Sequence, residues 1–586
     1  MMKYEDRLLG EVIRADSNVI EILMTETIPS SSPIIFGKVY RVGQIGALVK
    51  IPIGNIIIYG SVNSISNQAS KSDEIDIHGR RFLTIDLIGE KIGNKPFEKG
   101  VGIYPTIGEK VYLVTDKDLF DIYGGEEKTG FKIGTHSSSS NLPIMLDTHK
   151  LVLRHSAILG STGSGKSNTT VGILKSIIKS YPNSRTILID PHGEYSSAFP
   201  DAHVVRVGDQ KQPLYVPYWL MNFEELAYFL VGAKSSDDAR PEYRRLREKI
   251  VEMKKSWRFL GQDKNEITAD SPVPFDVREL WYFMNYLVNA TYDESALDKQ
   301  IPTEAKVTEK GDSEVLEPAI FESYSIGAGA PYKSKDQVFY AYEKNIFTRL
   351  KDTRYDFMFH PGEYKDGSKD ISNLLVEWLG NTERLTIFDL SNVPFEVLDI
   401  TVGLITRVIY ESMFWGRYEQ NTGKNRPLLM VYEEAHSYLS DKDNSIYAKK
   451  AVERIFKEGR KFGVGSMVIS QRPSELSETI LSQVGTFIAL RLTNSSDQGI
   501  VNSLAPDNMN TIIKLLPSLR IGEAIVIGEA IKIPTRVRIA EEFPRAASDD
   551  PELVKRWSEH LVTGGQEEIY EQVVKKMRSR KFTRSE

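Results

Sequence analysis

The chain has 586 residues, of which 41% are hydrophobic and 26% are charged, and its formal net charge is −6. Single hydrophobic cores rarely exceed about 250 to 300 residues, so several domains are expected. The sequence contains no cysteine, which excludes disulfides, thiolate zinc sites and a cysteine nucleophile, and the mild net acidity gives no global sign of nucleic-acid binding.

Residues 1–120 are predicted to form a small β-barrel, with a β-sandwich as the alternative. Apolar or alternating runs recur at Val12 to Leu23, Ala47 to Ile58 and Phe82 to Ile88, and Gly, Asn, Ser and Pro clusters separate them. Residues 121–150 include the polar, turn-rich stretch GGEEKTGFKIGTHSSSSN, and they are predicted to be a linker.

A phosphate-binding loop opens the next segment, residues 151–219, which is predicted to be the first part of an α/β core. The pattern G-x-x-x-x-G-K-[ST] is formed by Gly160, Ser161, Thr162, Gly163, Ser164, Gly165, Lys166 and Ser167, and Asn168 follows. A strand-like run precedes the loop and an amphipathic helical pattern follows it, as phosphate binding at a helix N-terminus requires. The motif predicts binding of ATP or GTP, with Lys166 on the phosphates and Ser167 on Mg²⁺.

Two groups of polar residues flank this first strand and the next one. Arg154 and His155 come directly before the first strand, and we expect them to approach the phosphate loop from one side. The second strand, Thr186 to Asp190, is followed by Pro-His-Gly-Glu-Tyr. Asp190, His192 and Glu194 are candidates to face the nucleotide or its metal; alternatively, these side chains only cap a turn.

Residues 220–370 are predicted to be a helical insertion, because apolar residues recur there at helical spacing and the range from Glu304 to Lys335 is polar and loop-like. The core is predicted to resume over residues 371–545. A buried strand there ends in Glu433 and Glu434, which correspond to the metal-side acid and the water-polarising acid of P-loop ATPases. A later strand ends in Gln471, a candidate sensor of the γ phosphate.

A basic helix from Lys449 to Lys461 lies between these two strands. Arg460, near its end, has two interpretations: it caps the helix, or it reaches a nucleotide bound by a neighbouring subunit. We favour the second, with Arg454 as the substitute. Residues 546–586 are predicted to be a C-terminal helical tail that ends in a basic stretch containing Lys581 and Arg584.

Together these motifs resemble the HerA family of hexameric DNA-translocating ATPases, which is related to the FtsK motor. The resemblance rests on RHSAILGSTGSGKSN at 154–168, LIDPHGEY at 188–195, VYEEAH at 431–436, EGRKFGVG at 458–465 and SQRP at 470–473. It implies an α/β fold, a RecA-like P-loop core with an N-terminal barrel and a helical insertion, assembled as a homo-hexamer around double-stranded DNA.

The resemblance also implies roles for particular residues. Lys166 and Ser167 are the phosphate and metal residues, Glu433 is the metal-side acid and Glu434 the catalytic acid. Gln471 is then the γ-phosphate sensor, Arg460 the arginine acting in trans, and Arg154 an arginine near the phosphates. One departure is that Glu433 replaces the commoner Asp, so its metal contact is expected to be indirect. The cofactors implied are ATP and Mg²⁺.

The family commonly works with an effector, either a NurA-like nuclease or, in antiphage defence, a nuclease or a Sir2-like NAD-consuming protein. The N-terminal barrel is our candidate docking surface for it. The alternative function is a nucleotide-gated hexameric scaffold that activates an effector without translocation. A membrane-associated secretion ATPase is disfavoured, because the sequence has no apolar run of about 18 residues and no apolar signal segment. We expect a cytoplasmic protein.

Overall fold

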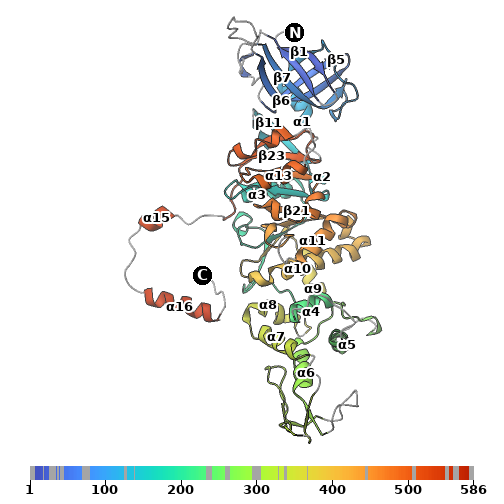
Figure 1. Ribbon diagram of the computed structural model, residues 1–586, viewed down its shortest axis with the longest axis vertical. Helices are drawn as coiled ribbons and strands as arrows, with labels where there is room; N and C mark the ends of the chain where they lie inside the picture. The colour runs from blue at the N-terminus through green and yellow to red at the C-terminus, as the bar shows by residue number, and fades with distance from the viewer. Residues whose placement is uncertain are drawn as a thin grey trace.

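The computed structural model is elongated, with the N-terminal strands at one end and a group of helices at the other (Figure 1). It describes residues 7–16, 19–25, 34–35, 38–39, 45–68, 80–123, 129–137, 139–231, 241–257, 264–293, 305–327, 329–334, 339–365, 367–441, 446–504, 510–547, 553–558 and 566–579. No helix in these ranges is both long enough and apolar enough to cross a membrane.

The N-terminal strands form a closed β-barrel, which confirms the barrel and not the sandwich. Six strands follow the order β2-β1-β9-β5-β6-β7, and the pairing of β2 with β7 closes the ring, while β8 pairs with β7 outside it. Apolar side chains such as Leu9, Val12 and Ile85 fill the interior. The strands are β1 (Leu8–Ala15), β2 (Ile20–Met24), β5 (Leu48–Ile53), β6 (Ile56–Gln68), β7 (Arg80–Ile92), β8 (Glu98–Lys99) and β9 (Lys110–Leu113).

An 11-stranded sheet forms the core of the molecule, in the order β11-β10-β24-β23-β22-β12-β21-β20-β13-β19-β14. The strands from β22 to β14 are all parallel. Apart from the edge strand β14, they are fully buried apolar runs, typical of a sheet covered on both faces. Their bounds are β12 (Ser156–Leu159), β13 (Thr186–Asp190), β14 (His203–Arg206), β19 (Leu385–Asp389), β20 (Leu428–Tyr432), β21 (Val464–Ser470) and β22 (Thr486–Ala489).

Four antiparallel strands extend this sheet beyond β22. They are β23 (Glu523–Gly528), β24 (Thr535–Ile539), β10 (Gly130–His136) and β11 (Ser139–Asp147). Two of them, β10 and β11, lie within residues 121–150, which the sequence predicts to be a linker, so that part of the prediction is corrected. The polar composition favours a linker, but β10 is ordered by its pairing with β24, which lies about four hundred residues later in the chain. Residues 124–128 and 138 of the predicted linker lie outside the described residues.

Helices cover both faces of the sheet. Among the described helices the longest is α10, which is buried over most of its length and packs along α11. The helices of this region are α1 (Asp116–Tyr123), α2 (Thr148–Leu153), α3 (Lys166–Ser180), α9 (Ile371–Leu379), α10 (Phe395–Trp415), α11 (Tyr447–Glu458), α12 (Glu478–Ser482), α13 (Ser495–Leu504) and α14 (Asn510–Ile513).

A helical group follows β14 in the chain and lies at the far end from the barrel (Figure 1). Aromatic residues such as Trp281, Phe339 and Tyr355 pack in its interior, as the helical spacing predicts. Within the polar range 304–335, β16 pairs with β17, and β18 pairs with β15, which precedes the range. The elements are α4 (Phe223–Val231), α5 (Pro241–Lys255), α6 (Val277–Asn289), β15 (Thr291–Tyr292), β16 (Val307–Glu309), β17 (Ile320–Phe321), β18 (Tyr332–Lys333), α7 (Tyr340–Leu350) and α8 (Asp356–Phe359).

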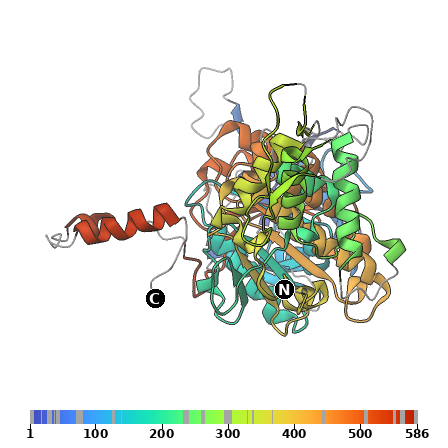
Figure 2. The same ribbon diagram turned by 90° about the horizontal axis from the view of Figure 1, so that it is seen from below.

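Two C-terminal helices stand away from the body, α15 (Leu553–Ser558) and α16 (Gln566–Ser579), as Figures 1 and 2 show. The side chains described on both helices are exposed. The last basic residues of the predicted tail, including Lys581 and Arg584, lie outside the described residues.

Candidate nucleotide site

The phosphate-binding loop joins the end of β12 to the start of α3, as the sequence predicts. Gly163 has φ 70° and Gly165 has φ 103°, left-handed values that side chains disfavour. The helix begins at Lys166, so its first backbone N–H groups face the loop and form an anion-binding helix N-terminus.

Neighbouring strand ends hold the loop in place. The Gly160 N–H donates to Ser470 O at the end of β21, and the Ser161 N–H donates to Arg491 O after β22. The Gly522 N–H donates to Ser164 O from the turn before β23. The loop is therefore positioned by three segments that lie far from it in the sequence.

Lys166 lies within this loop and is only 7% exposed. Burial lowers its pKa, and the carboxylates of Glu434, Glu433 and Glu194 act in the opposite direction. Its Nζ lies 3.4 Å from Ser161 O. The ammonium group is therefore surrounded by acids from the ends of β13 and β20.

Glu433 directly follows β20 and is 2% exposed. Its Oε2 accepts a hydrogen bond of 2.7 Å from the Tyr195 hydroxyl, and its carbonyl accepts one from Tyr438. Burial raises the pKa of Glu433 to about 8, although the Tyr195 bond acts against this shift. The surroundings of Glu433 therefore favour its protonated form.

Glu434 has a different environment from its neighbour. Its φ is 46°, a left-handed conformation that turns its side chain toward His436, whose Nδ1 lies 3.1 Å from Glu434 Oε2. Burial acts to raise the pKa of Glu434, but the nearby His436 ring and the charge of Lys166 outweigh it and the pKa is lowered. Glu434 is therefore an ionised carboxylate suited to orienting water or accepting a proton.

Two further residues reach the phosphate loop from strand ends. Thr162 Oγ1 donates to Gln471 Oε1 at 2.6 Å, which brings the predicted sensor onto the loop. Ser167 Oγ donates to Glu194 Oε2 at 3.4 Å. The acid in contact with the metal-side serine is thus Glu194, and Glu433 makes its hydrogen bond with Tyr195 instead.

Of the residues after β13, one caps the turn and another contacts the phosphate loop, which are the two roles considered from the sequence. Asp190 is fully buried and accepts the N–H groups of His192, Gly193 and Tyr195, so it caps the turn. Burial raises its pKa to about 6, and nearby Asp389 adds to the shift. His192 is exposed, and only Glu194 of this group is hydrogen-bonded to the phosphate loop.

The two candidate arginines near the end of α11 differ in how they are held. Arg454 Nε donates to Glu458 Oε1 at 2.8 Å, and its guanidinium lies 4.9 Å from the centre of the Tyr410 ring. Arg460, in the turn that follows α11, is exposed, and its side chain has no hydrogen bond or ion pair with any described residue. Of the two, Arg460 is the one available to another molecule.

Arg154 and His155 lie at the amino end of β12, whereas the phosphate loop lies at its carboxyl end. The expectation that they approach the loop of their own chain is therefore wrong, since four extended residues span about 13 Å. Arg154 pairs with Glu529. His155 stacks on Phe456 of α11, with 4.5 Å between ring centres, and its Nδ1 accepts the Ser466 N–H. Burial lowers the pKa of His155 to about 4.

Sequence reasoning missed Tyr195 and His436 as partners of the paired acids. Both lie inside the quoted motifs, LIDPHGEY and VYEEAH, so a signal was present. Their roles depend on which carboxylate each one reaches, and only the fold determines that.

Comparisons with known proteins identify the family of the chain. Residues 131–409 match the family model "Helicase HerA, central domain", and residues 418–548 match "Helicase HerA-like C-terminal". The DNA double-strand break repair helicase HerA of Sulfolobus acidocaldarius is 30% identical over 455 residues, which cover 77% of each chain. The protein of the same description from Pyrococcus furiosus is 28% identical over 484 residues, covering 78% of this chain and 77% of that one.

Among solved structures, VirB4 of Thermoanaerobacter pseudethanolicus matches with a TM-score of 0.43 and 15% identity, covering 71% of this chain and 97% of that one. The plasmid coupling protein TrwB in complex with ADP and Mg²⁺ matches with a TM-score of 0.43 and 14% identity, covering 72% and 95%.

A phosphate loop in a parallel sheet, with acids and a glutamine on neighbouring strand ends, defines a P-loop ATPase. The two family models cover most of the α/β core and the helical group between its halves. The chain belongs to the HerA family.

Proposed function

We propose that the chain hydrolyses ATP as part of a homo-hexameric ring that translocates double-stranded DNA and works with a partner effector. The observation that carries this proposal is the convergence of Lys166, Glu434 and Gln471 on one phosphate loop. Family membership supports the motor function, because the relatives matched over most of their length are described as DNA double-strand break repair helicases.

Each of these side chains has a separate role in the proposed hydrolysis. Lys166 and the N–H groups at the start of α3 would bind the phosphates, and the ionised Glu434 would orient the attacking water. Gln471, already in contact with Thr162, would contact the terminal phosphate when nucleotide binds to the loop and lose that contact when it leaves. The other loop residues and Asn168 would complete the cradle.

The hydroxyl of Ser167 and the carboxylate of Glu194 fit Mg²⁺, because both present oxygen atoms at the loop and the ion prefers such donors. Bound there, Mg²⁺ would neutralise charge that develops on the phosphates. Glu433, assigned to the metal side by resemblance, would act through the hydroxyl of Tyr195 and the turn that carries Glu194.

A closed ring would complete the site. Arg460 is exposed, and its side chain makes no hydrogen bond or ion pair with the described residues of its own chain. A guanidinium that opposes the transferring phosphate raises turnover by about 10³ to 10⁵. We assign it to the nucleotide of the neighbouring subunit. Arg154 lies far from its own phosphate loop, so it too would reach phosphates only in a neighbour.

The effector would be a NurA-like or other nuclease, or a Sir2-like NAD-consuming protein, docked on the N-terminal barrel. An antiphage role would follow from that pairing. The second candidate function is the nucleotide-gated scaffold, which the net charge of −6 favours because DNA affinity depends on Lys and Arg contacts with phosphates.

One set of measurements separates the two candidates. ATPase activity of the purified chain should rise on addition of double-stranded DNA, and Lys166→Ala should abolish both activity and effector stimulation while the ring still forms. DNA-independent hydrolysis, together with full effector activity in the Lys166→Ala ring, would contradict the motor function and support the scaffold function. The mass of the protein, alone and with the effector, checks the hexamer in either case.

A further inference from the structure

His436 lies in the short turn η10 (Ala435–Ser437), which directly follows the paired acids. Its side chain is only 12% exposed. Its Nδ1 atom lies 3.1 Å from Glu434 Oε2 and 3.5 Å from Ser470 Oγ at the end of β21. One ring nitrogen thus lies beside both the acid that faces Lys166 and the strand that leads to Gln471.

Ser470 fixes the surroundings of the ring. It is fully buried, and its carbonyl accepts the Gly160 N–H of the phosphate loop. Its hydroxyl oxygen accepts the Arg472 N–H at 3.0 Å. Because Ser470 is bonded to the loop, the position of the His436 ring relative to the loop is also constrained.

The Glu434 Oε2 atom needs a donor. It is buried, and within the described part of the chain no donor reaches it with the geometry of a hydrogen bond. Its distance to His436 Nδ1 is within the hydrogen-bond range, so a small rotation of either side chain would align the two groups. Catalytic hydrogen bonds are often poorly aligned until the substrate binds. An ionised carboxylate only accepts, so the proton of this bond belongs to Nδ1.

Lys166 and His192 are the other two cationic groups that act on Glu434. Lys166 is assigned to the phosphates, so bound nucleotide would draw its ammonium group away from the carboxylate. His192 is exposed, so water and salt screen its charge. His436 is therefore the partner that stays with Glu434 when nucleotide binds.

We propose that His436 is a positioning residue for the hydrolysis of ATP. The N–H group at Nδ1 holds Glu434 Oε2, and the other oxygen of the carboxylate is left to accept a hydrogen bond from the attacking water. This role rests on the proposed hydrolysis at the same site. Since His436 acts through the acid, its loss lowers kcat and leaves ATP affinity unchanged.

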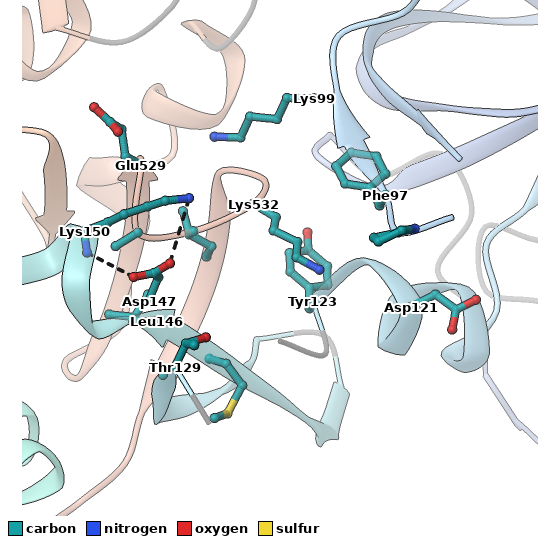
Figure 3. A pocket seen from close by; sticks show the side chains of 15 residues that line it. Phe97, Lys99, Asp121, Tyr123, Thr129, Leu146, Asp147, Lys150, Glu529 and Lys532 are labelled. Carbon is teal, nitrogen blue, oxygen red and sulfur yellow. Dashed lines mark hydrogen bonds and ion pairs between the residues drawn. The ribbon is translucent and has the colours of Figure 1, made fainter. Parts of the chain in front are cut away.

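Substitutions of His436 that differ in which ring nitrogen they replace test this role. The amide nitrogen of Asn can take the place of Nδ1, whereas that of Gln reaches the place of Nε2. We expect His436→Ala and His436→Gln to lower kcat by about tenfold to a hundredfold at unchanged equilibrium ATP affinity, and His436→Asn to retain most of the activity. His149→Asn is the matched control: this histidine is exposed on α2, beside Lys150, which lines the cavity between the barrel and the core (Figure 3).

A second measurement separates positioning from a general structural effect. In a Glu434→Gln background, His436→Ala should cause no further loss of the hydrolysis rate under single-turnover conditions, because the carboxylate that it positions is absent. A further loss as large as in the natural chain would overturn the proposal.

Equal kcat values for His436→Asn and His436→Gln would also overturn the proposal, since Nδ1 would then have no special role. If Glu434→Gln by itself keeps full activity, the proposed hydrolysis at this site fails, and not only the role of His436. Circular dichroism and gel filtration of each variant distinguish a loss of rate from a loss of folding.

Discussion

Tyr195 and Glu433 are joined by a hydrogen bond of 2.7 Å, although the first follows β13 and the second follows β20. The bond stabilises the buried carboxyl and fixes the turn that carries Glu194 to the strand that carries Glu434. The two adjacent glutamates thus have opposite pKa shifts: burial raises the pKa of Glu433, whereas the pKa of Glu434 is lowered by nearby His436 and Lys166.

Glu434→Gln should reduce ATP turnover by about 10² to 10⁴, the usual contribution of a positioned base, while ATP binding remains. Glu433→Gln is the matched control, since an amide resembles the protonated form of the acid that burial favours, and it should keep far more activity. Steady-state hydrolysis and equilibrium ATP binding of both variants check this. Equal losses in the two variants would contradict the division of roles.

The stability of the nucleotide-free protein should fall as pH rises. The folded pKa of Glu433, about 8, lies above its ordinary value of 4.5, so folding favours the proton and this stability is lost as pH rises through the interval between them. Thermal melts at pH 6 and pH 8.5 should show a larger loss for the natural chain than for Glu433→Gln. A variant that loses as much as the natural chain would show that Glu433 is not the titrating group.

Tyr195→Phe should lower the free energy of unfolding by about 1 to 3 kcal/mol, because it leaves a buried carboxyl without its donor. Urea denaturation measures this. In the Glu433→Gln background, the cost of Tyr195→Phe should change, since the two side chains are coupled. Strict additivity of the two changes would mean that the bond contributes nothing to stability.

Glu194→Gln should raise the Mg²⁺ concentration needed for half-maximal ATPase activity, because the carboxylate beside Ser167 loses its charge. A magnesium titration of hydrolysis measures the shift. Glu541→Gln, at an exposed acid, is the control and should leave the titration unchanged. Identical midpoints for Glu194→Gln and the control would exclude Glu194 from the metal side.

Arg460→Ala should reduce turnover by about 10³ or more, whereas Arg454→Ala should act mainly through the loss of its bond to Glu458. Mixing Arg460→Ala chains with Lys166→Ala chains tests sharing between subunits. Some interfaces of the mixed rings then combine an intact phosphate loop with an intact Arg460, so part of the activity should return. If mixed rings stay as inactive as their parents, Arg460 does not act in trans.

The phosphate loop and the paired acids could be predicted from the sequence because each is a short, local pattern on a strand end. The position of Arg154 could not, because closeness in sequence says nothing about which end of a strand faces the ligand. The β10–β11 hairpin was also missed. Polar, turn-rich residues surround its apolar positions such as Phe131 and Ile144, and the pairing that orders β10 comes from β24.

That hairpin has a mechanical consequence. Strand β10 is attached to the 11-stranded sheet by a hydrogen-bonded ladder with β24. In this ladder Gly134, Thr135 and His136 lie opposite Ile539, Arg538 and Val537. A pull on the barrel along the strands would load that ladder in shear, with its bonds sharing the force. Movement of β24 would therefore be transmitted directly to β10 through this ladder.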